Sequence, residues 1–133
     1  MSQENVEIVR RFYDFWRDRD YSLIEPLVHP DAVIDVTRNV FNPGVHRGLA
    51  GFRRFLEQID EAWEGLELTP MELIDGGDTV VVAHRLSGKG RSSGVPTEMV
   101  LYGVCTLDAG KILRFTGGFQ DRSEALEAAG LRE

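Results

Sequence analysis

The feature that most constrains the fold is a change in the spacing of apolar residues near residue 64. Before it, residues 48–63 place apolar side chains at intervals of three and four, the period of one helix face. After it, apolar and β-branched residues tend to alternate with polar ones, which is the period of a strand. A helical part followed by a sheet-forming part predicts the α+β class. The helix positions are Phe52, Phe55, Leu56, Ile59 and Trp63.

The remaining elements follow from the same periods and from turn residues. Residues 6–16 have the helical period, and this helix is expected to end near Asp20. A short second helix over residues 23–28 and a strand over residues 32–38 come before the helix at 48–63. Asp121 is a preferred helix cap and is expected to begin a short C-terminal helix. The later strands are expected at residues 66–73, 79–87, 97–107 and 112–119, with tight turns between them.

These elements predict one domain over residues 1–133, because a chain of 133 residues is ordinary for a single core. We expect a strongly curved antiparallel sheet with about three N-terminal helices on one face. The space between the helices and the sheet is then the default place for a ligand.

Composition excludes several classes of function. The net charge of −7 argues against a nucleic-acid binder, which needs clustered Lys and Arg. No apolar run approaches the roughly 20 residues of a membrane span, and the polar N-terminus is not typical of a signal peptide, so a cytoplasmic protein is expected. Cys105 is the single cysteine, and the three histidines lack metal-ligand spacing. We therefore predict no disulfide, no metal and no cofactor.

Several short motifs occur in an order typical of one family. They are LVHPDA at residues 27–32, RGLAG at 47–51, DGGDTVVV at 75–82, GKI at 110–112 and DRSEAL at 121–126. With the helix at residues 8–16 they span nearly the whole chain, which resembles the SnoaL-like bacterial proteins of the nuclear transport factor two-like superfamily. The resemblance implies a cone-shaped α+β barrel, often a homodimer. Members of the superfamily include ketosteroid isomerase, polyketide cyclases, limonene epoxide hydrolase and non-catalytic binding domains, so the fold does not give the function.

The resemblance to ketosteroid isomerase can be followed residue by residue. The tyrosine of its first helix falls on Phe12 or, with a slip of one residue, on Tyr13. Its catalytic base falls on Val36, next to Asp35, and its second acid falls on Tyr102. The base is therefore absent unless a bulge turns Asp35 toward the cavity.

The resemblance to limonene epoxide hydrolase places its arginine on Arg85 and one acid near Asp121, while the other acid falls on Ser87. From both comparisons we predict Arg85, Tyr102 and Asp121 as candidate catalytic residues. By this alignment Arg85 faces the cavity, and His84 lies on the convex face, which we expect to form a homodimer.

Two functions remain open at this point. The first is a binding protein for a small apolar molecule with one polar end. The second is an enzyme of the cyclase, isomerase or hydrolase kind acting on a lipophilic carbonyl or epoxide, and a protein-interaction module is a weaker third. The residues expected to contact the ligand are Phe12, Trp16, Ile34, Val36, Phe55, Arg85 and Tyr102.

Overall fold

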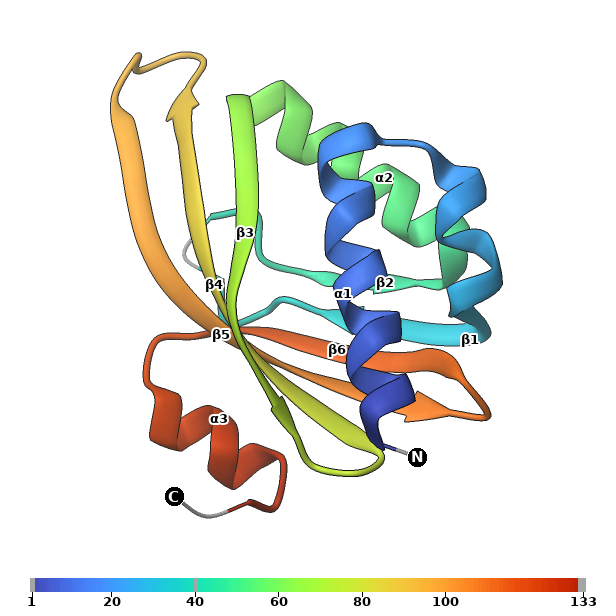
Figure 1. The fold of residues 1–133 in the computed structure, drawn as a ribbon. Helices are drawn as coiled ribbons and strands as arrows, with labels where there is room; N and C mark the ends of the chain where they lie inside the picture. Colours follow the sequence, from blue (N-terminus) through green and yellow to red (C-terminus); the bar gives the residue numbers. More distant parts are fainter. Residues whose placement is uncertain (1, 40, 132–133) are drawn as a thin grey trace.

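The computed structural model describes residues 2–39 and 41–131 (Figure 1). The chain begins with helix α1 (Ser2–Asp18) and two short 3₁₀ turns (Tyr21–Leu23 and Glu25–Leu27). Strands β1 (Val28–Asp35) and β2 (Val45–Arg47) precede helix α2 (Gly48–Ala62). The second half contains β3 (Trp63–Asp75), β4 (Thr79–Gly90), β5 (Pro96–Asp108), β6 (Lys111–Phe119) and the short helix α3 (Arg122–Ala128).

The six strands form one curved, open sheet in the order β2-β1-β6-β5-β4-β3. Strands β3 to β6 form the predicted antiparallel meander. The prediction of a fully antiparallel sheet is wrong at one place, because β1 runs parallel to β6. These two strands are not joined by a turn, so no hairpin fixes their relative direction. The α+β class and the C-terminal helix are confirmed.

The segment between α1 and α2 differs from the prediction. The expected second helix is two 3₁₀ turns, one capped by Asp20 and the other containing Pro26 near its start. Strand β1 begins at Val28, and its pairing with β6 is interrupted by a bulge that accommodates Pro30. The three-residue strand β2 was not predicted, because it carries too few residues to show a period.

Helices α1 and α2 cover one face of the sheet, and α3 covers part of the other face (Figure 1). The buried side of α1 includes Val9 and Phe15, which have no exposed surface. Val81 packs on the other face, against Phe119 and Leu126 near α3. No helix in the described residues is long and apolar enough to cross a membrane.

The predicted faces of β4 are wrong by one residue. Val82 packs beneath α1, and His84 forms a hydrogen bond to that helix. The alternation itself is present, but residues 80–84 do not by themselves show its phase. Residues 80–84 are buried on both faces because α3 covers the second face, so each position is apolar or nearly so. The apolar residues assigned to a dimer surface therefore face α1, and the homodimer stays a prediction.

Candidate functional site

A partly enclosed pocket lies between α1, α2 and the concave face of the sheet. We call it the inner pocket, and its volume is about 70 Å³. Its aromatic wall comes mainly from the two helices, through side chains such as Phe12 and Phe52, whose ring centroids are 5.3 Å apart. Five of the residues predicted to contact a ligand lie at this pocket: Phe12, Trp16, Ile34, Val36 and Phe55.

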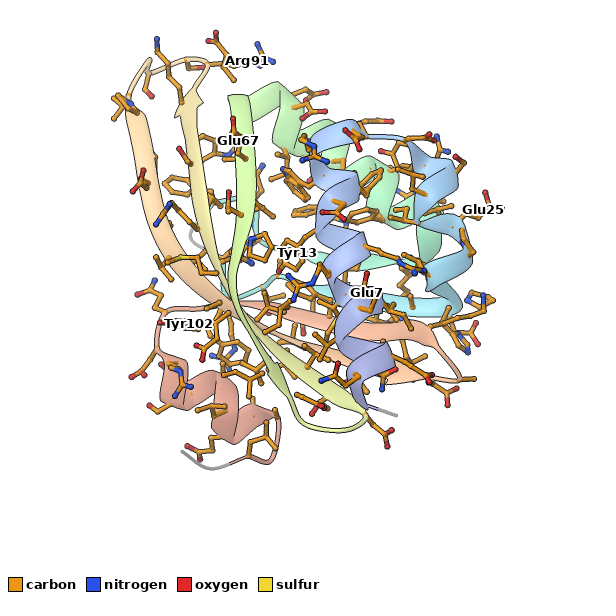
Figure 2. The ribbon with its side chains drawn as sticks, in the orientation of Figure 1. Glu7, Tyr13, Glu25, Glu67, Arg91 and Tyr102 are labelled. Atoms are coloured by element: carbon orange, nitrogen blue, oxygen red, sulfur yellow. The ribbon has the colours of Figure 1, made fainter. Side chains whose placement is uncertain are left out.

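A polar pair, Tyr13 and His84, lies within this apolar surround. Tyr13 projects from α1 and His84 from β4, and Tyr13 Oη is 2.7 Å from His84 Nδ1. Their exposed fractions are 6% and 5%. Figure 2 shows Tyr13 pointing from α1 toward the sheet. The sequence places these two residues 71 positions apart, and the fold brings them into a single hydrogen-bonded unit.

Burial shifts the proton affinity of both members of this pair. Loss of solvent lowers the pKa of His84 from 6.5 to about 4, because the charged imidazolium is not compensated. Burial likewise raises the pKa of Tyr13 well above its usual value. Both side chains are therefore uncharged at neutral pH. Strongly shifted groups of this kind in a pocket are typical of functional sites.

The described residues that line the inner pocket include no Asp, Glu, Lys or Arg. Apart from Tyr13 and His84, the polar side chains of the lining are Trp16 and Asn39. The indole N–H of Trp16 is already used, since it donates to the carbonyl oxygen of Leu66 at 3.1 Å. The pocket can therefore offer neutral hydrogen bonds and apolar contacts, and it offers no charge.

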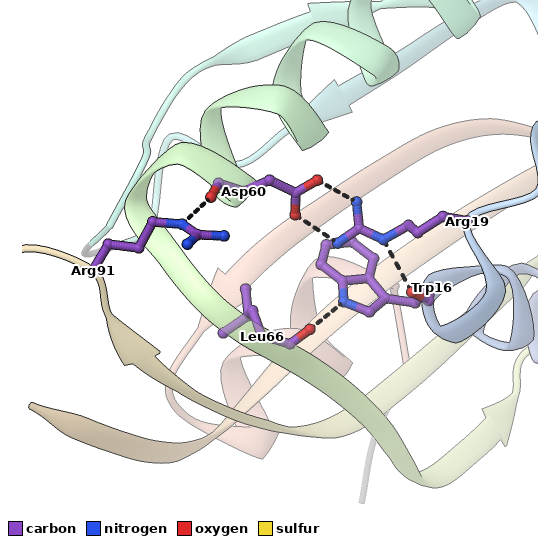
Figure 3. Close-up of polar contacts among 5 residues, drawn as sticks. All are labelled: Trp16, Arg19, Asp60, Leu66 and Arg91. Atoms are coloured by element: carbon purple, nitrogen blue, oxygen red, sulfur yellow. Dashed lines mark hydrogen bonds and ion pairs between the residues drawn. The ribbon is translucent and has the colours of Figure 1, made fainter. Parts of the chain in front are cut away.

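Trp16 separates the inner pocket from a larger groove on the outside, which we call the outer groove. The outer groove has a volume of about 600 Å³ and runs between α1, the end of α2 and β3. Arg19 holds the indole by lying over its ring at 4.9 Å, and it forms two hydrogen bonds of 3.0 and 3.1 Å to Asp60 (Figure 3). Arg91, which follows the last residue of β4, donates a hydrogen bond to the backbone oxygen of Asp60. Trp16 is thus a wall shared by two spaces.

The structure does not bring the predicted catalytic residues Arg85, Tyr102 and Asp121 to the inner pocket. Arg85 points from the opposite face of β4, is 45% exposed and lies 3.8 Å from Glu98. Tyr102 packs with Val81 beside α3 (Figure 2). The prediction that Arg85 and Tyr102 face the pocket is therefore wrong, since the phase of the strands is shifted by one residue.

Asp121 and Asp35 have local structural partners. Asp121 begins α3 and accepts hydrogen bonds from the backbone and hydroxyl of Ser123, which lower the pKa of its carboxyl. Asp35 bonds to Thr37 and pairs with Arg114 at 3.0 Å, on the face of β1 opposite Ile34. Strand β1 does contain a bulge, between Val28 and Val33, but Asp35 still lies on the face opposite the pocket.

The residue that sequence reasoning missed is His84. Its assignment to the convex face followed from an alignment and not from the residues around it. One signal could have corrected this, since Leu86 and Val82 share its face and both are apolar, whereas Arg85 and Ser87 share the other face. An exposed arginine marks the solvent side of a strand more reliably than a histidine does.

At the wall of the inner pocket, the backbone of Gly118 packs closely against the segment that follows β1. Gly118 has a φ of +88°, and a methyl group there would lie 2.5 Å from Asn39 Oδ1 and 2.8 Å from the carbonyl carbon of Arg38. Gly118→Ala is therefore expected to lower the free energy of unfolding by about 2 kcal/mol, from backbone strain and overpacking. Gly110→Ala is the control, with a φ of +78° and nothing within 4 Å, and should cost about 1 kcal/mol. Equal losses in chemical denaturation would contradict the close packing at Gly118.

In the described residues, no three His, Cys, Asp or Glu side chains gather as metal ligands. Cys105 is buried in the strand beneath α1, and burial raises the pKa of its thiol to about 12. It is therefore a packed thiol and not a reactive one.

The curved sheet, the helices on its concave face and the pocket between them define a protein of the nuclear transport factor two-like kind. A family model described as a SnoaL-like domain matches residues 9–115, and the chain belongs to this family. No curated protein matches the sequence.

Solved structures give the same fold. One similar structure, an NTF2-like protein of unknown function from Burkholderia pseudomallei, is 20% identical with a TM-score of 0.77 over 93% of this chain and 95% of that one. A putative polyketide cyclase from Sinorhizobium meliloti is 23% identical with a TM-score of 0.65, over 84% and 93% of the chains. TerC, co-crystallized with polyporic acid, is 26% identical with a TM-score of 0.76, over 96% and 98%. At these identities the first two show the fold alone.

Proposed function

We propose that this protein binds a small, largely apolar molecule with one polar end in the inner pocket. The observation that carries the proposal is the Tyr13–His84 pair, buried at the wall of a pocket that is otherwise almost entirely apolar. Pockets of this composition are typical of small-molecule sites, in which a few polar groups orient an apolar ligand. The co-crystal of TerC with a small molecule supports the proposal, because TerC has the same fold.

The size of the pocket limits the ligand. Its volume of about 70 Å³ is smaller than that of an engineered cavity of roughly 150 Å³ that binds benzene. A ligand the size of one ring therefore requires the wall to move slightly. Trp16 is a large part of the wall that has space behind it, because it borders the outer groove as well, together with Tyr13, Leu66 and Leu68.

Filling the inner pocket tests the proposal. Leu101 lies at the pocket and is 8% exposed, whereas its neighbour Val100 is on the opposite face and is 40% exposed. We expect Leu101→Phe to weaken the binding of acetophenone, a one-ring ketone, by at least about tenfold, because the added volume has no other place to go. Val100→Phe is the matched control and should bind as the wild type does.

Calorimetric titration measures both variants. The proposal is contradicted if the wild-type protein does not bind acetophenone up to its solubility, or if the two variants lose affinity equally. A thermal melt of Leu101→Phe shows whether the variant is folded, since overpacking costs about 1–3 kcal/mol.

An enzyme acting on a lipophilic carbonyl compound is the second candidate function. The observation that favours it is the same pair, because a neutral imidazole beside a buried phenol can polarise a carbonyl oxygen. Turnover of a ketone or epoxide that is lost in His84→Gln and kept in Arg85→Ala would establish it. Binding without turnover across such substrates would leave the binding function alone.

A further inference from the structure

Among the described residues, one ring nitrogen at the inner pocket, Nε2 of His84, has no hydrogen-bond partner. Nδ1 of His84 is hydrogen-bonded to Tyr13, but no described residue pairs with Nε2 on the other side of the ring. In the described residues, the fully buried side-chain polar atoms without a partner are His46 Nε2 and Thr79 Oγ1. His84 Nε2 is not one of them, so this atom keeps some accessible surface. Since the His84 ring lines the inner pocket and is 5% exposed, its free nitrogen opens into that pocket.

The bond to Tyr13 determines which nitrogen of His84 holds the proton. A phenol O–H is a good donor, and the unprotonated nitrogen of an imidazole is a good acceptor. If Nδ1–H donated to Tyr13 instead, both the phenol proton and the bare Nε2 would lack a partner among the described residues, whereas donation from Tyr13 leaves only Nε2–H without one. Tyr13 therefore donates to Nδ1, and the single proton of the neutral ring lies on Nε2.

We infer that the inner pocket selects an uncharged molecule whose oxygen accepts a hydrogen bond from Nε2–H of His84, with Tyr13 as the positioning residue that fixes this tautomer. The inference rests on the proposed function and names its ligand class, which is a neutral ketone, aldehyde, quinone or ether. The low pKa of His84, about 4, supports it because the ring stays neutral in ordinary buffers.

The same lining disfavours charged ligands. An ionised carboxylate would lose its hydration on entering, and neutral donors such as Nε2–H of His84 and the amide of Asn39 cannot replace it, because no Lys or Arg is among the described lining residues. A cation would find no carboxylate there and would meet the N–H of His84 with the wrong polarity. The pocket therefore distinguishes ligands by charge as well as by shape.

Three molecules of similar shape test the inference: acetophenone, α-methylstyrene and benzoate. They share a phenyl ring and differ in the group beside it, which is a ketone, a terminal alkene or a carboxylate. Transfer out of water by itself favours the alkene. The quantity to compare is therefore the ratio of acetophenone affinity to α-methylstyrene affinity, measured in the wild type and in variants.

His84→Phe removes the donor and keeps a ring in its place. We expect the affinity ratio to fall by about tenfold, the effect of one neutral hydrogen bond in an apolar site. Arg85→Ala is the matched control on the next residue of β4, on the opposite face, and should leave the ratio unchanged. Benzoate should not bind at pH 7.

Two spectroscopic measurements that keep His84 remain decisive if His84→Phe does not fold. Nitrogen NMR of the ring should show Nε2 protonated and Nδ1 unprotonated. In Tyr13→Phe, the fraction of rings that carry the proton on Nδ1 should increase. The carbonyl stretching frequency of bound acetophenone should be lower than in a hydrocarbon solvent. A merely structural role for Tyr13 would change stability but neither spectrum.

The outcomes separate the inference from the function on which it rests. If neither acetophenone nor α-methylstyrene binds, the proposed function fails and the inference fails with it. If both bind but the ratio is the same in His84→Phe, or if the proton lies on Nδ1, the function stands and the inference is overturned. Tight binding of benzoate overturns the inference as well.

Discussion

Between pH 7 and pH 4 the protein is expected to lose about 3 kcal/mol of stability through His84 alone. Burial lowers the pKa of His84 from 6.5 to about 4 in the folded state, while the unfolded chain keeps the ordinary value. Between these two values the unfolded state binds one more proton than the folded state, so acid favours unfolding. The contribution is complete above pH 6.5 and decreases as the pH falls toward 4, at about 1.4 kcal/mol for each pH unit.

The measurement is chemical denaturation at several pH values, on the wild type and on His84→Gln. Glutamine does not titrate in this range, and its amide oxygen can accept the hydrogen bond from Tyr13. The difference in the free energy of unfolding between the two proteins should shift by about 3 kcal/mol between pH 7 and pH 4. Carboxyl groups titrate equally in both proteins and cancel. A difference that does not change with pH would show that His84 is not buried as described.

We expect Trp16→Ala to lower the stability of the protein and to raise its affinity for a larger ligand. Trp16 is 8% exposed and packs against Phe15 and other core residues, so truncation should cost about 3–5 kcal/mol. It also removes the largest side chain of the wall between the inner pocket and the outer groove, which Tyr13, Leu66 and Leu68 share. A two-ring ketone such as 2-acetylnaphthalene should then bind the variant at least about tenfold more tightly than the wild type, because the second ring gains buried area.

Trp63→Ala is the matched control for this experiment. Trp63 is 6% exposed and packs edge to face against Phe41, but it borders only the outer groove and not the inner pocket. It should lose a similar amount of stability and gain no affinity for the two-ring ketone. Calorimetric titration at a temperature where both variants are folded makes the comparison. A gain in both variants, or in neither, would contradict the role of Trp16 as a shared wall.

The layers of the fold could be predicted from the sequence because the apolar period is strong. The helix at α2 and the meander from β3 to β6 follow from spacing and turn residues alone. The parallel pairing of β1 with β6 could not be predicted, since it joins residues 81 to 84 positions apart with no connecting turn. Such long-range pairings are determined by packing in the folded state and not by local sequence.

The helical side of the site was also predictable, whereas the strand side was assigned to the wrong face. Phe12, Trp16 and Phe55 lie on helix faces whose buried side is obvious from their period. On β4 a shift of one residue exchanges His84 for Arg85, and burial of residues 80–84 on both faces left only the end of the strand, at Arg85 and Ser87, to show the phase. The Tyr13–His84 pair could be foreseen only with the correct phase, because His84 must face α1 to reach Tyr13.

Ligand binding in the inner pocket is tested by the NMR shifts of methyl groups on titration with acetophenone. Ile34, Leu86 and Leu101 line the inner pocket, whereas Val81, Val100 and Val104 lie on the opposite face of the sheet. Binding in the inner pocket predicts large shifts in the first group and small shifts in the second. Shifts concentrated in the second group would place the site beside Arg85 and Tyr102 and would contradict binding in the inner pocket.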